Sequence, residues 1–423
     1  MALTRVAWIG RLTGPKGEIA QKIIAQVAPA FPQLQFTIVG GPVTEEYRSI
    51  AGENVELTGF VKDVNEIFKQ NDLVIGAGRV PVEAMRFGLP VIAVGENRYI
   101  GPINDETIAL AKATNFGDCD QLTAWSTPQL IYDLHSIISG EVELPLANYP
   151  GYVADYRIDH VYPQVMDVYR QARIDAVLQP FKEIPVLTYH RVLTQPPQGS
   201  KFNIYVSVEE LESQIVNLKQ RGFEFVTFKD LAEGVRPKKP VILSFDDGYE
   251  DNYQNLLPLL KKHNARAVIY ALADRSLKNN SWDMAKAEPE APLMNDVQLL
   301  ECHQSGLVEI GSHGLRHQHL SQLSDNEVRQ EIFDSKQALE KLLGDDVVSF
   351  AYPYGDYGDR EAELVNEAGY CFGVATVSGP VKMADDLMRV RRITMFPNTK
   401  ASKFWRKTSG WYLRYCKLKG KDF

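Results

Sequence analysis

The strongest constraint on the fold is a repeated alternation of short β-branched runs with helical patterns. In the first part of the chain the runs begin at Val6, Phe36, Val55, Leu73 and Pro90. Helical patterns separate them, and two more lie near residues 128–139 and 162–178. Strands that alternate with helices indicate βαβ units and a parallel sheet. We therefore predict an α/β fold with a Rossmann-like domain over residues 1–178.

A second alternation follows a segment bracketed by two prolines. The helical pattern stops at Gln179 to Pro185, which makes this segment the best candidate for a linker. Strand-like runs then occur at residues 186–189, 223–226, 241–245, 266–270, 308–310, 347–351, 372–375 and 390–393. Such a series, interrupted by helical segments, predicts a regular or distorted (β/α) barrel over residues 184–398.

Composition and charge limit the partners and the compartment. The formal charge of -8 argues against nucleic acid as a general partner. We find neither an apolar run near the roughly 18 residues that cross a bilayer nor a secretory signal, so we predict a cytoplasmic protein. The cysteines, Cys119, Cys302, Cys371 and Cys416, form no Cys-x-x-Cys pair, and we expect reduced structural thiols.

The last 25 residues, 399–423, differ in charge from the rest of the chain. They carry eight basic residues and one acid, interleaved with Phe404, Trp405, Trp411, Tyr412 and Tyr415. This composition favours peripheral contact with an anionic membrane, at its inner face for a cytoplasmic protein. The alternative is a short helix packed on the barrel.

Polar clusters follow three of the predicted barrel strands. They contain Asp246 and Asp247, then His313 and His317, and finally the run from Tyr352 to Gly355. The carboxyl ends of parallel barrel strands share one rim, so these clusters should converge. Two imidazoles and a carboxylate suit zinc and neighbouring divalent metals. Because adjacent aspartates cannot easily point the same way, we expect one to bind metal and the other to accept a proton.

These motifs resemble those of the polysaccharide deacetylases of carbohydrate esterase family four. The first family motif corresponds to Ser244-Phe-Asp-Asp-Gly248, which implies Asp246 as the catalytic base and Asp247 as a metal ligand. The second corresponds to His313 through His317, with Gly314 in place of a hydroxyl residue, and implies that both histidines are ligands. The resemblance spans about residues 184–396.

The third family motif, Arg-x-Pro-Tyr, maps onto Ala351-Tyr-Pro-Tyr354, so the arginine that would pair with the base is absent there. A branch of the family reads Phe-Ala-Tyr-Pro-Tyr-Gly at this point and has a Tyr-His pair on its first strand. Phe350 to Gly355 and Tyr189-His190 match that branch. Within it, the backbone N–H of Tyr354 would be an oxyanion donor.

The general acid is not given by a motif, since the fourth and fifth family motifs are not visible after Gly373. An imidazole is the usual proton donor near neutral pH. His190 directly follows a predicted strand, which should place it on the metal rim. We therefore predict His190 as the general acid and His319 as the next candidate.

In the first domain, cations and a carboxylate occupy predicted strand-to-helix connections. Arg11 and Lys16 follow the first strand, where a helix N-terminus also favours anions, and Glu83 could bind a ribose diol. Together they resemble the donor-binding half of family-four GT-B glycosyltransferases, over about residues 5–118. That resemblance implies a nucleotide sugar held by Arg11, Lys16 and Glu83. Ile75 stands where that family often has another glutamate.

We expect the acceptor half of that glycosyltransferase fold to be missing, because the chain starts on the predicted first strand of the donor half. The expected roles of the domain are work beside another chain or nucleotide-sugar sensing, unless the start codon has been placed too late.

The combination predicts a metal-dependent N-deacetylase for an N-acetylated amino sugar of a polysaccharide or glycolipid, by analogy in envelope or exopolysaccharide synthesis. Two alternatives stay open. One is a nucleotide-sugar glycosyltransferase with an auxiliary deacetylase domain, and the other is a catalytically silent carbohydrate-binding scaffold.

Overall fold

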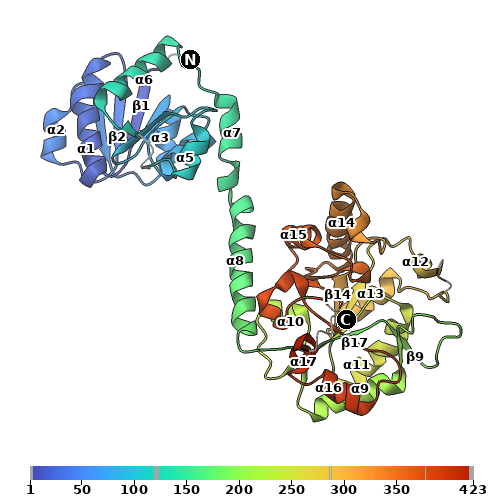
Figure 1. Ribbon diagram of the computed structural model, residues 1–423. Coiled ribbons are helices and arrows are strands. Elements are labelled where there is room, and N and C mark those ends of the chain that lie inside the picture. Colours follow the sequence, from blue (N-terminus) through green and yellow to red (C-terminus); the bar gives the residue numbers. More distant parts are fainter. Residues whose placement is uncertain (1–2, 119–122, 285, 287, 377, 419–423) are drawn as a thin grey trace. The chain divides into compact units, whose positions relative to one another are not determined.

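The computed structural model describes residues 3–118, 123–284, 286, 288–376 and 378–418. The chain divides into two compact units, Met1–Val165 and Met166–Phe423 (Figure 1). Both are built mainly from parallel strands joined through helices, as the alternating pattern predicts. The α/β class, with a Rossmann-like domain followed by a barrel, is thereby confirmed.

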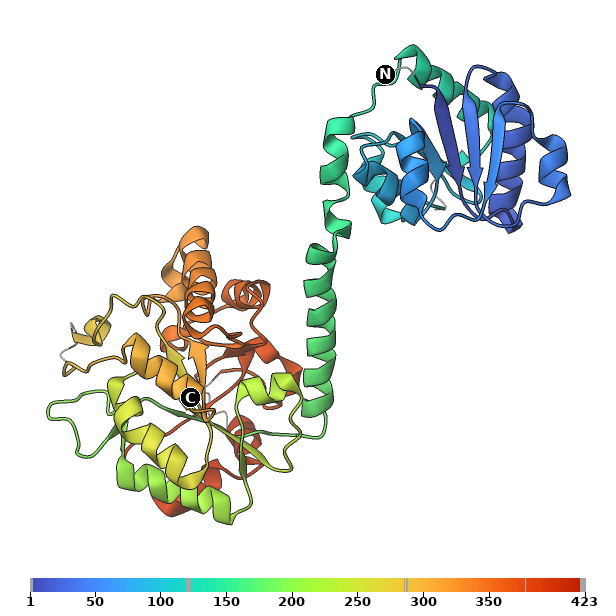
Figure 2. The same cartoon turned by 180° about the vertical axis from the view of Figure 1, so that it is seen from behind.

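The first unit is a twisted sheet with helices on both faces (Figure 2). Its strands are β1 Arg5–Ile9, β2 Gln35–Val39, β3 Val55–Gly59, β4 Leu73–Gly76, β5 Val91–Val94, β6 Arg98–Pro102 and β7 Thr123–Ala124. Its helices are α1 Gly14–Lys22, α2 Glu45–Ile50, α3 Val64–Gln70, α4 Arg79–Arg86, α5 Ile108–Ala113, α6 Thr127–Ser139 and α7 Tyr149–Tyr152. Helix α8, Ile158–Leu178, contains the boundary between the two units.

The strand order β3-β2-β1-β4-β5-β6-β7 places a topological switch point between β1 and β4. Strands β1 to β5 pair in parallel, whereas β6 and β7 are antiparallel. The connections after β1 and β2 approach closely, since a Cβ on Gly40 would lie 1.8 Å from the Gly10 carbonyl oxygen. In sheets of this kind ligands bind at the carboxyl edge beside the switch point.

The second unit is a distorted (β/α) barrel. Its strands are β8 Val186–Tyr189, β9 Arg191–Leu193, β10 Tyr205–Ser207, β11 Glu224–Phe225, β12 Pro240–Phe245, β13 Ala267–Ala271, β14 Val308–Ser312, β15 Ser349–Ala351, β16 Phe372–Val374 and β17 Ile393–Thr394. Its helices are α9 Val208–Gln220, α10 Phe228–Glu233, α11 Leu257–His263, α12 Ser281–Met284, α13 Asp296–Gln304, α14 Asp325–Leu343, α15 Asp359–Glu367, α16 Ala401–Lys407 and α17 Tyr412–Leu418.

The barrel strands run in the order β16-β15-β14-β13-β12-β8-β17, and every pair is parallel. Strand β17 pairs with β8, while Val390, just before it, forms a bridge with Val374 of β16. Residues 390–394 therefore connect the two outer strands and close the barrel. All six residues of β12 are buried, because helices cover the outside and side chains fill the inside.

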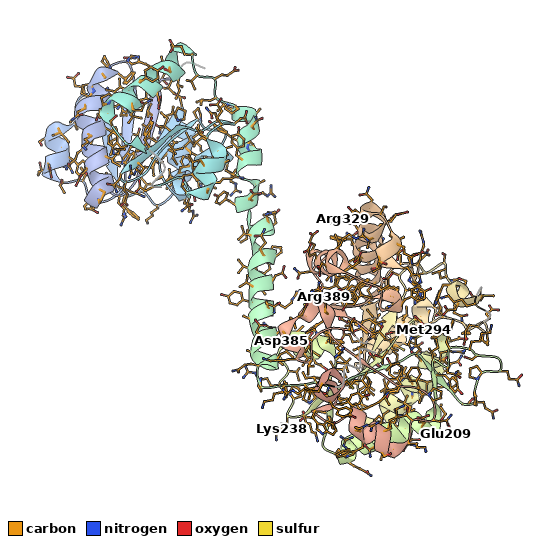
Figure 3. All side chains as sticks on the ribbon, viewed as in Figure 1. Glu209, Lys238, Met294, Arg329, Asp385 and Arg389 are labelled. Atoms are coloured by element: carbon orange, nitrogen blue, oxygen red, sulfur yellow. The ribbon has the colours of Figure 1, made fainter. Side chains whose placement is uncertain are left out.

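Local signals begin and end the covering helices. Helix α14 starts with a capping box formed by Ser324 and Glu327 and ends at Gly344, whose φ of 67° is left-handed. Helix α13 has a similar box formed by Asn295 and Gln298. Figure 3 labels Met294, immediately before this helix, and its backbone N–H donates to the Gly248 carbonyl oxygen at 2.9 Å.

The unit boundary lies earlier than the linker expected at residues 179–185, within α8. The end of that helix packs with the barrel, because Ile174, Val177 and Leu178 are buried in one cluster with Ile184 and Val186. The expected limits of residues 178 and 184 thus separate segments that share a core.

The tail is not separate from the barrel, as its first helix is part of the second unit. Phe404 of α16 is buried in the main barrel core, and Lys407 donates to the Thr394 carbonyl oxygen of β17. Cys302, Cys371 and Cys416 are free and buried, while Cys119 lies outside the described residues. Within the described ranges, no helix combines the length and apolar character needed to cross a membrane.

Candidate metal centre

Three side chains from two strand ends form a buried cluster. Asp247 follows β12, and His313 and His317 follow β14. Their ligand atoms all lie within 4.8 Å of one another, and the side chains are nearly inaccessible to solvent. The predicted convergence of these three residues is present, because both strands end at the same rim of the barrel.

The backbone around the cluster is strained in a way that aims these side chains. Asp247 and His317 have φ values of 74° and 59°, in the left-handed region that residues with a Cβ rarely adopt. Tyr354, on the neighbouring connection after β15, has φ 59° as well. Such strain costs about 1–3 kcal/mol per residue and concentrates at functional sites.

The geometry fits a shared cation. His313 Nε2 and His317 Nε2 lie 3.3 Å and 3.2 Å from Asp247 Oδ1. Ligand bonds of about 2.0–2.2 Å to one ion would separate the ligand atoms by roughly 3.0–3.4 Å. Within the described part of the chain, the buried Asp247 Oδ1 has no hydrogen-bond partner, so these approaches lack hydrogen-bond geometry. An oxygen and two imidazole nitrogens form a donor set that suits zinc and similar divalent metals.

The charge balance of the cluster depends on burial and on these contacts. Burial alone would raise the pKa of Asp247, but the contacts with His313 and His317 outweigh it and hold that pKa well below its ordinary value. Burial lowers the pKa of His317, which favours the neutral imidazole that a metal requires.

Asp246 does not belong to this cluster and is held by an arginine. Arg392 Nη1 and Nη2 donate to Asp246 Oδ1 and Oδ2 at 2.6 Å and 2.8 Å. Arg392 Nε donates to the Ala375 carbonyl oxygen at 2.7 Å, and the residue is 2% exposed. Burial raises the pKa of Asp246, but the charge of Arg392 outweighs it, so that the pKa lies below its ordinary value.

Arg392 corrects the expectation that no arginine pairs with Asp246. The sequence motif lacks an arginine at Ala351, but residues 390–394 close the barrel and bring Arg392 into its interior. A guanidinium can thus reach the same carboxylate from another strand. The Val-Arg-Arg-Ile run was visible as a strand, yet nothing local indicated that one of its arginines points inward.

The glycine at position 314 has a structural reason. Its φ is 79°, and a Cβ there would lie 3.1 Å from Glu331 Oε2. That carboxylate, buried on α14, accepts the backbone N–H groups of Leu315 and Arg316 at 2.8 Å and 3.0 Å. Glu331 therefore steadies the loop between the two histidines, where the family motif has a hydroxyl.

The other predicted site residues lie around the same rim. His190 follows β8, and its Nε2 is 4.0 Å from Asp246 Oδ2. The Tyr354 ring meets His317 edge-on at 4.4 Å and stacks on His319 at 3.8 Å. Burial raises the pKa of the Tyr354 hydroxyl to about 12. Both histidines considered as general acid thus lie beside the site, with His190 the one next to Asp246.

In the first unit, the predicted residues lie at the carboxyl edge of the sheet. Arg11 follows β1, Lys16 lies in the first turn of α1, and Glu83 lies on α4 after β4. Arg11 Nη2 contacts Glu96 Oε1 at 3.1 Å, and Arg79 forms an ion pair with Glu83. Because β1 and β4 flank the switch point, these residues border the edge where ligands bind in such folds.

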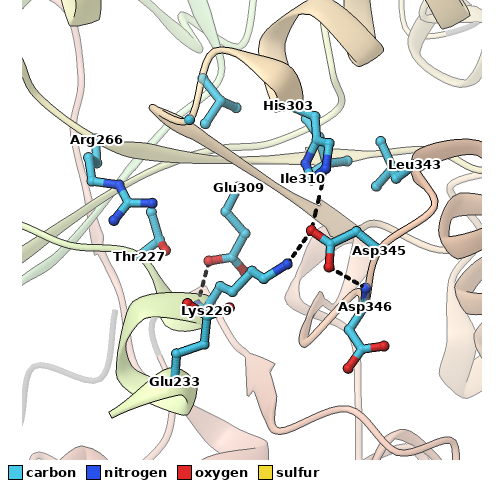
Figure 4. A pocket seen from close by; sticks show the side chains of 12 residues that line it. Thr227, Lys229, Glu233, Arg266, His303, Glu309, Ile310, Leu343, Asp345 and Asp346 are labelled. Atoms are coloured by element: carbon cyan, nitrogen blue, oxygen red, sulfur yellow. Dashed lines mark hydrogen bonds and ion pairs between the residues drawn. The ribbon is translucent and has the colours of Figure 1, made fainter. Parts of the chain in front are cut away.

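One cavity of the second unit lies away from the metal cluster. It has a volume of about 320 Å³ and lies where barrel strands begin, near Arg266 before β13 and Val308 of β14. Figure 4 shows Lys229 and His303 converging on Asp345 in this cavity. None of the metal-cluster residues lines it.

A distorted (β/α) barrel with a buried Asp-His-His cluster, and with a separate aspartate held by an arginine, is typical of a hydrolase with a site that fits a divalent metal. The comparisons with known proteins agree. Residues 233–373 match the family model for polysaccharide deacetylase, and residues 4–113 match that for group 1 glycosyl transferases. The chain therefore carries a polysaccharide deacetylase domain of carbohydrate esterase family four, a hydrolase that acts on amide bonds. This domain is C-terminal to a glycosyltransferase-like region.

Curated relatives match the second half. The polysaccharide deacetylase-like protein YxkH of Bacillus subtilis is 26% identical over 227 residues, covering 52% of this chain and 75% of its own length. The poly-beta-1,6-N-acetyl-D-glucosamine N-deacetylase of Staphylococcus epidermidis is 28% identical over 229 residues, covering 49% and 77%. Among solved structures, the Streptococcus pyogenes deacetylase PplD in complex with acetate is 26% identical, covering 54% and 98%, with a TM-score of 0.47.

Proposed function

We propose that the barrel hydrolyses the acetamide of an N-acetylated amino sugar within a polysaccharide or glycolipid, using a divalent metal, zinc being the best fit. One observation carries the proposal: the buried Asp247, His313 and His317 cluster lies beside Asp246, which Arg392 keeps ionised. The Staphylococcus epidermidis relative is a poly-beta-1,6-N-acetyl-D-glucosamine N-deacetylase, which favours a hexosamine polymer as the substrate.

The chain supplies the groups for each proton transfer. A divalent cation held by Asp247, His313 and His317 would supply Lewis-acid polarisation of the acetyl carbonyl. Asp246 accepts a proton as a water oxygen bonds to the carbonyl carbon. The Tyr354 backbone N–H donates to the oxygen that gains negative charge. The C–N bond then breaks as His190 gives a proton to the leaving nitrogen, so that acetate and a free amine result.

The test is to incubate the full chain with nucleotide-linked, lipid-linked and oligomeric N-acetylhexosamines and to read acetate release and sugar transfer by mass spectrometry. Acetate release that a chelator stops and zinc restores supports the proposal. Sugar transfer without acetate release would favour the glycosyltransferase alternative. Neither product, with sugar binding retained, would identify a silent scaffold.

For the first unit we propose nucleotide-sugar binding through Arg11, Lys16 and Glu83. The family match over residues 4–113 and the placement of these residues beside the switch point support it. The pairing of a nucleotide-sugar domain with a deacetylase suggests a role in the synthesis of an envelope or secreted polysaccharide, on the cytoplasmic side.

For the tail we propose peripheral contact with an anionic membrane. Trp405 and Trp411 are 53% and 46% exposed and lie beside basic residues in the sequence. Phe404, in contrast, is buried in the barrel core. Truncation after Asn398 would remove Phe404 from that core, so substitution of the exposed tryptophans is the cleaner change. In a flotation assay with anionic liposomes, the intact chain should float with the lipid, and the double variant Trp405→Ala, Trp411→Ala should not. An intact chain that does not float rejects the contact.

A further inference from the structure

The two imidazoles of the metal cluster are supported in different ways. His313 Nδ1 donates to the Ala351 carbonyl oxygen at 2.7 Å, which fixes its ring and leaves Nε2 for the metal. His317 Nδ1 is buried, and the described residues offer it no hydrogen-bond partner. Its orientation must therefore come from another kind of contact.

That contact is a stack with Trp282. The indole and the His317 imidazole have centroids 4.6 Å apart and planes inclined by 18°. The Tyr354 ring limits the imidazole from another side, edge-on at 4.4 Å. An imidazole pressed against a flat ring can turn only if that ring moves, so the stack restricts the torsion that would carry Nε2 away from Asp247.

Trp282 is itself held in place. It packs on a buried cluster of Tyr249, Leu272, Ala291 and Leu293, with Leu277 beside it. The segment that carries it is closed at its base by Asn280, whose side chain accepts from Ala291 N at 2.7 Å and donates to the Pro289 oxygen at 3.1 Å. The indole is thus mounted on a fixed support and not on a free surface loop.

We propose that Trp282 is a positioning residue that holds His317 in its metal-binding orientation by ring stacking. The stack does for His317 what a hydrogen bond does for His313. The inference rests on the proposed metal site and adds a residue from the connection between β13 and α13, which contributes no ligand. Residues that orient metal ligands typically change metal affinity by about 10–100-fold when removed.

The test uses the full chain, stripped of metal and titrated with Zn²⁺ against a chromophoric chelator. Trp282→Leu fills part of the space without a flat ring and should bind Zn²⁺ about 10–100-fold more weakly. Trp282→Phe keeps a stackable ring and should restore most of the affinity. Leu277→Ala disturbs the same supporting cluster and should leave the affinity unchanged. The visible spectrum of the Co²⁺-loaded protein should change only in Trp282→Leu.

The outcomes separate the two proposals. If the wild-type chain binds no Zn²⁺, the proposed metal site and this inference both fail. If the wild type binds and Trp282→Leu binds equally well, only the role of Trp282 is rejected. If Leu277→Ala weakens binding as much as Trp282→Leu, the cluster acts by general packing and the stacking role is likewise rejected.

Discussion

Asp246 and Arg392 form a bidentate ion pair in the barrel interior although 146 positions separate them in the chain. Asp246 follows β12, the strand on which the first family motif begins. Arg392 lies on residues 390–394, the segment that closes the barrel. The pair gives the proposed base a fixed position and favours its ionised form. It also ties closure of the barrel to the competence of the site.

Replacing Arg392 by methionine should destabilise the protein. It leaves a buried carboxylate without its partner, which costs about 3–5 kcal/mol. Chemical denaturation measures the loss, and Arg392→Met combined with Asp246→Asn should recover part of it because the unpaired charge is gone. Equal stability of the single and double variants would contradict a charge-based cost.

The same variant should shift the acidic limb of the rate profile. Arg392 lowers the pKa of Asp246, while burial raises it. Without the guanidinium the carboxyl pKa rises, the base is protonated at higher pH, and the limb moves to higher pH. Steady-state rates across pH check this, with Arg391→Met as the matched control on the adjacent position. A limb that stays in place would mean that another group titrates there.

The two adjacent aspartates should separate by function. Asp246→Asn removes the proposed base and should lower the rate by about 10²–10⁴-fold while Zn²⁺ remains bound. Asp247→Asn, by contrast, should lose metal and activity together, as should removal of His313 or His317. Metal analysis of the purified variants decides. If Asp246→Asn lost the metal and Asp247→Asn kept it, the two roles would be exchanged.

His190→Ala should retain metal and lower the rate, because the leaving amine would lack its proton donor. His190 Nε2 lies 4.0 Å from Asp246 Oδ2, close to the reacting groups but outside the ligand set. The comparison is His319→Ala, whose ring stacks on Tyr354. Near-wild-type turnover of His190→Ala would transfer the role of acid to another group, with His319 next.

The first unit should bind a nucleoside diphosphate in the full chain. Arg11→Ala and Lys16→Ala remove cations from the diphosphate, and Glu83→Ala removes the ribose acceptor, so each should weaken binding in calorimetry. Arg86→Ala, exposed at the far end of the same helix as Glu83, is the control. A folded protein that binds neither UDP, GDP nor a nucleotide sugar would leave this region without the proposed role.

Lys407 should make stability depend on pH. Burial lowers its pKa from 10.5 to about 8. Between these values the unfolded chain binds a proton that the folded chain does not, so stability rises with pH from about 8 to 10.5, by at most about 3 kcal/mol. Denaturation of wild type and Lys407→Met across this range measures the difference. A constant difference between the two would show that Lys407 is charged in the folded state.

The sequence by itself determined the two alternating series, and with them the parallel sheets and the common rim. Residue type and position at strand ends were enough to predict that Asp247, His313 and His317 converge, because parallel strands end on one side. The division between Asp246 and Asp247 also followed from the alternation of side chains along the backbone. These properties are local, because they depend on residue type and on position along a strand and not on which other segments pack nearby.

The tertiary structure decided which distant groups support the site. Arg392 reaches Asp246 only because the last strand closes the barrel, and Glu331 supports the histidine loop only because α14 packs beneath it. Trp282 meets His317 across two separate connections. No local pattern encodes these contacts, since each depends on the packing of segments that are distant in the sequence. Likewise, the sequence shows Phe404 only as an aromatic residue in a basic tail, and the packing makes it a core residue.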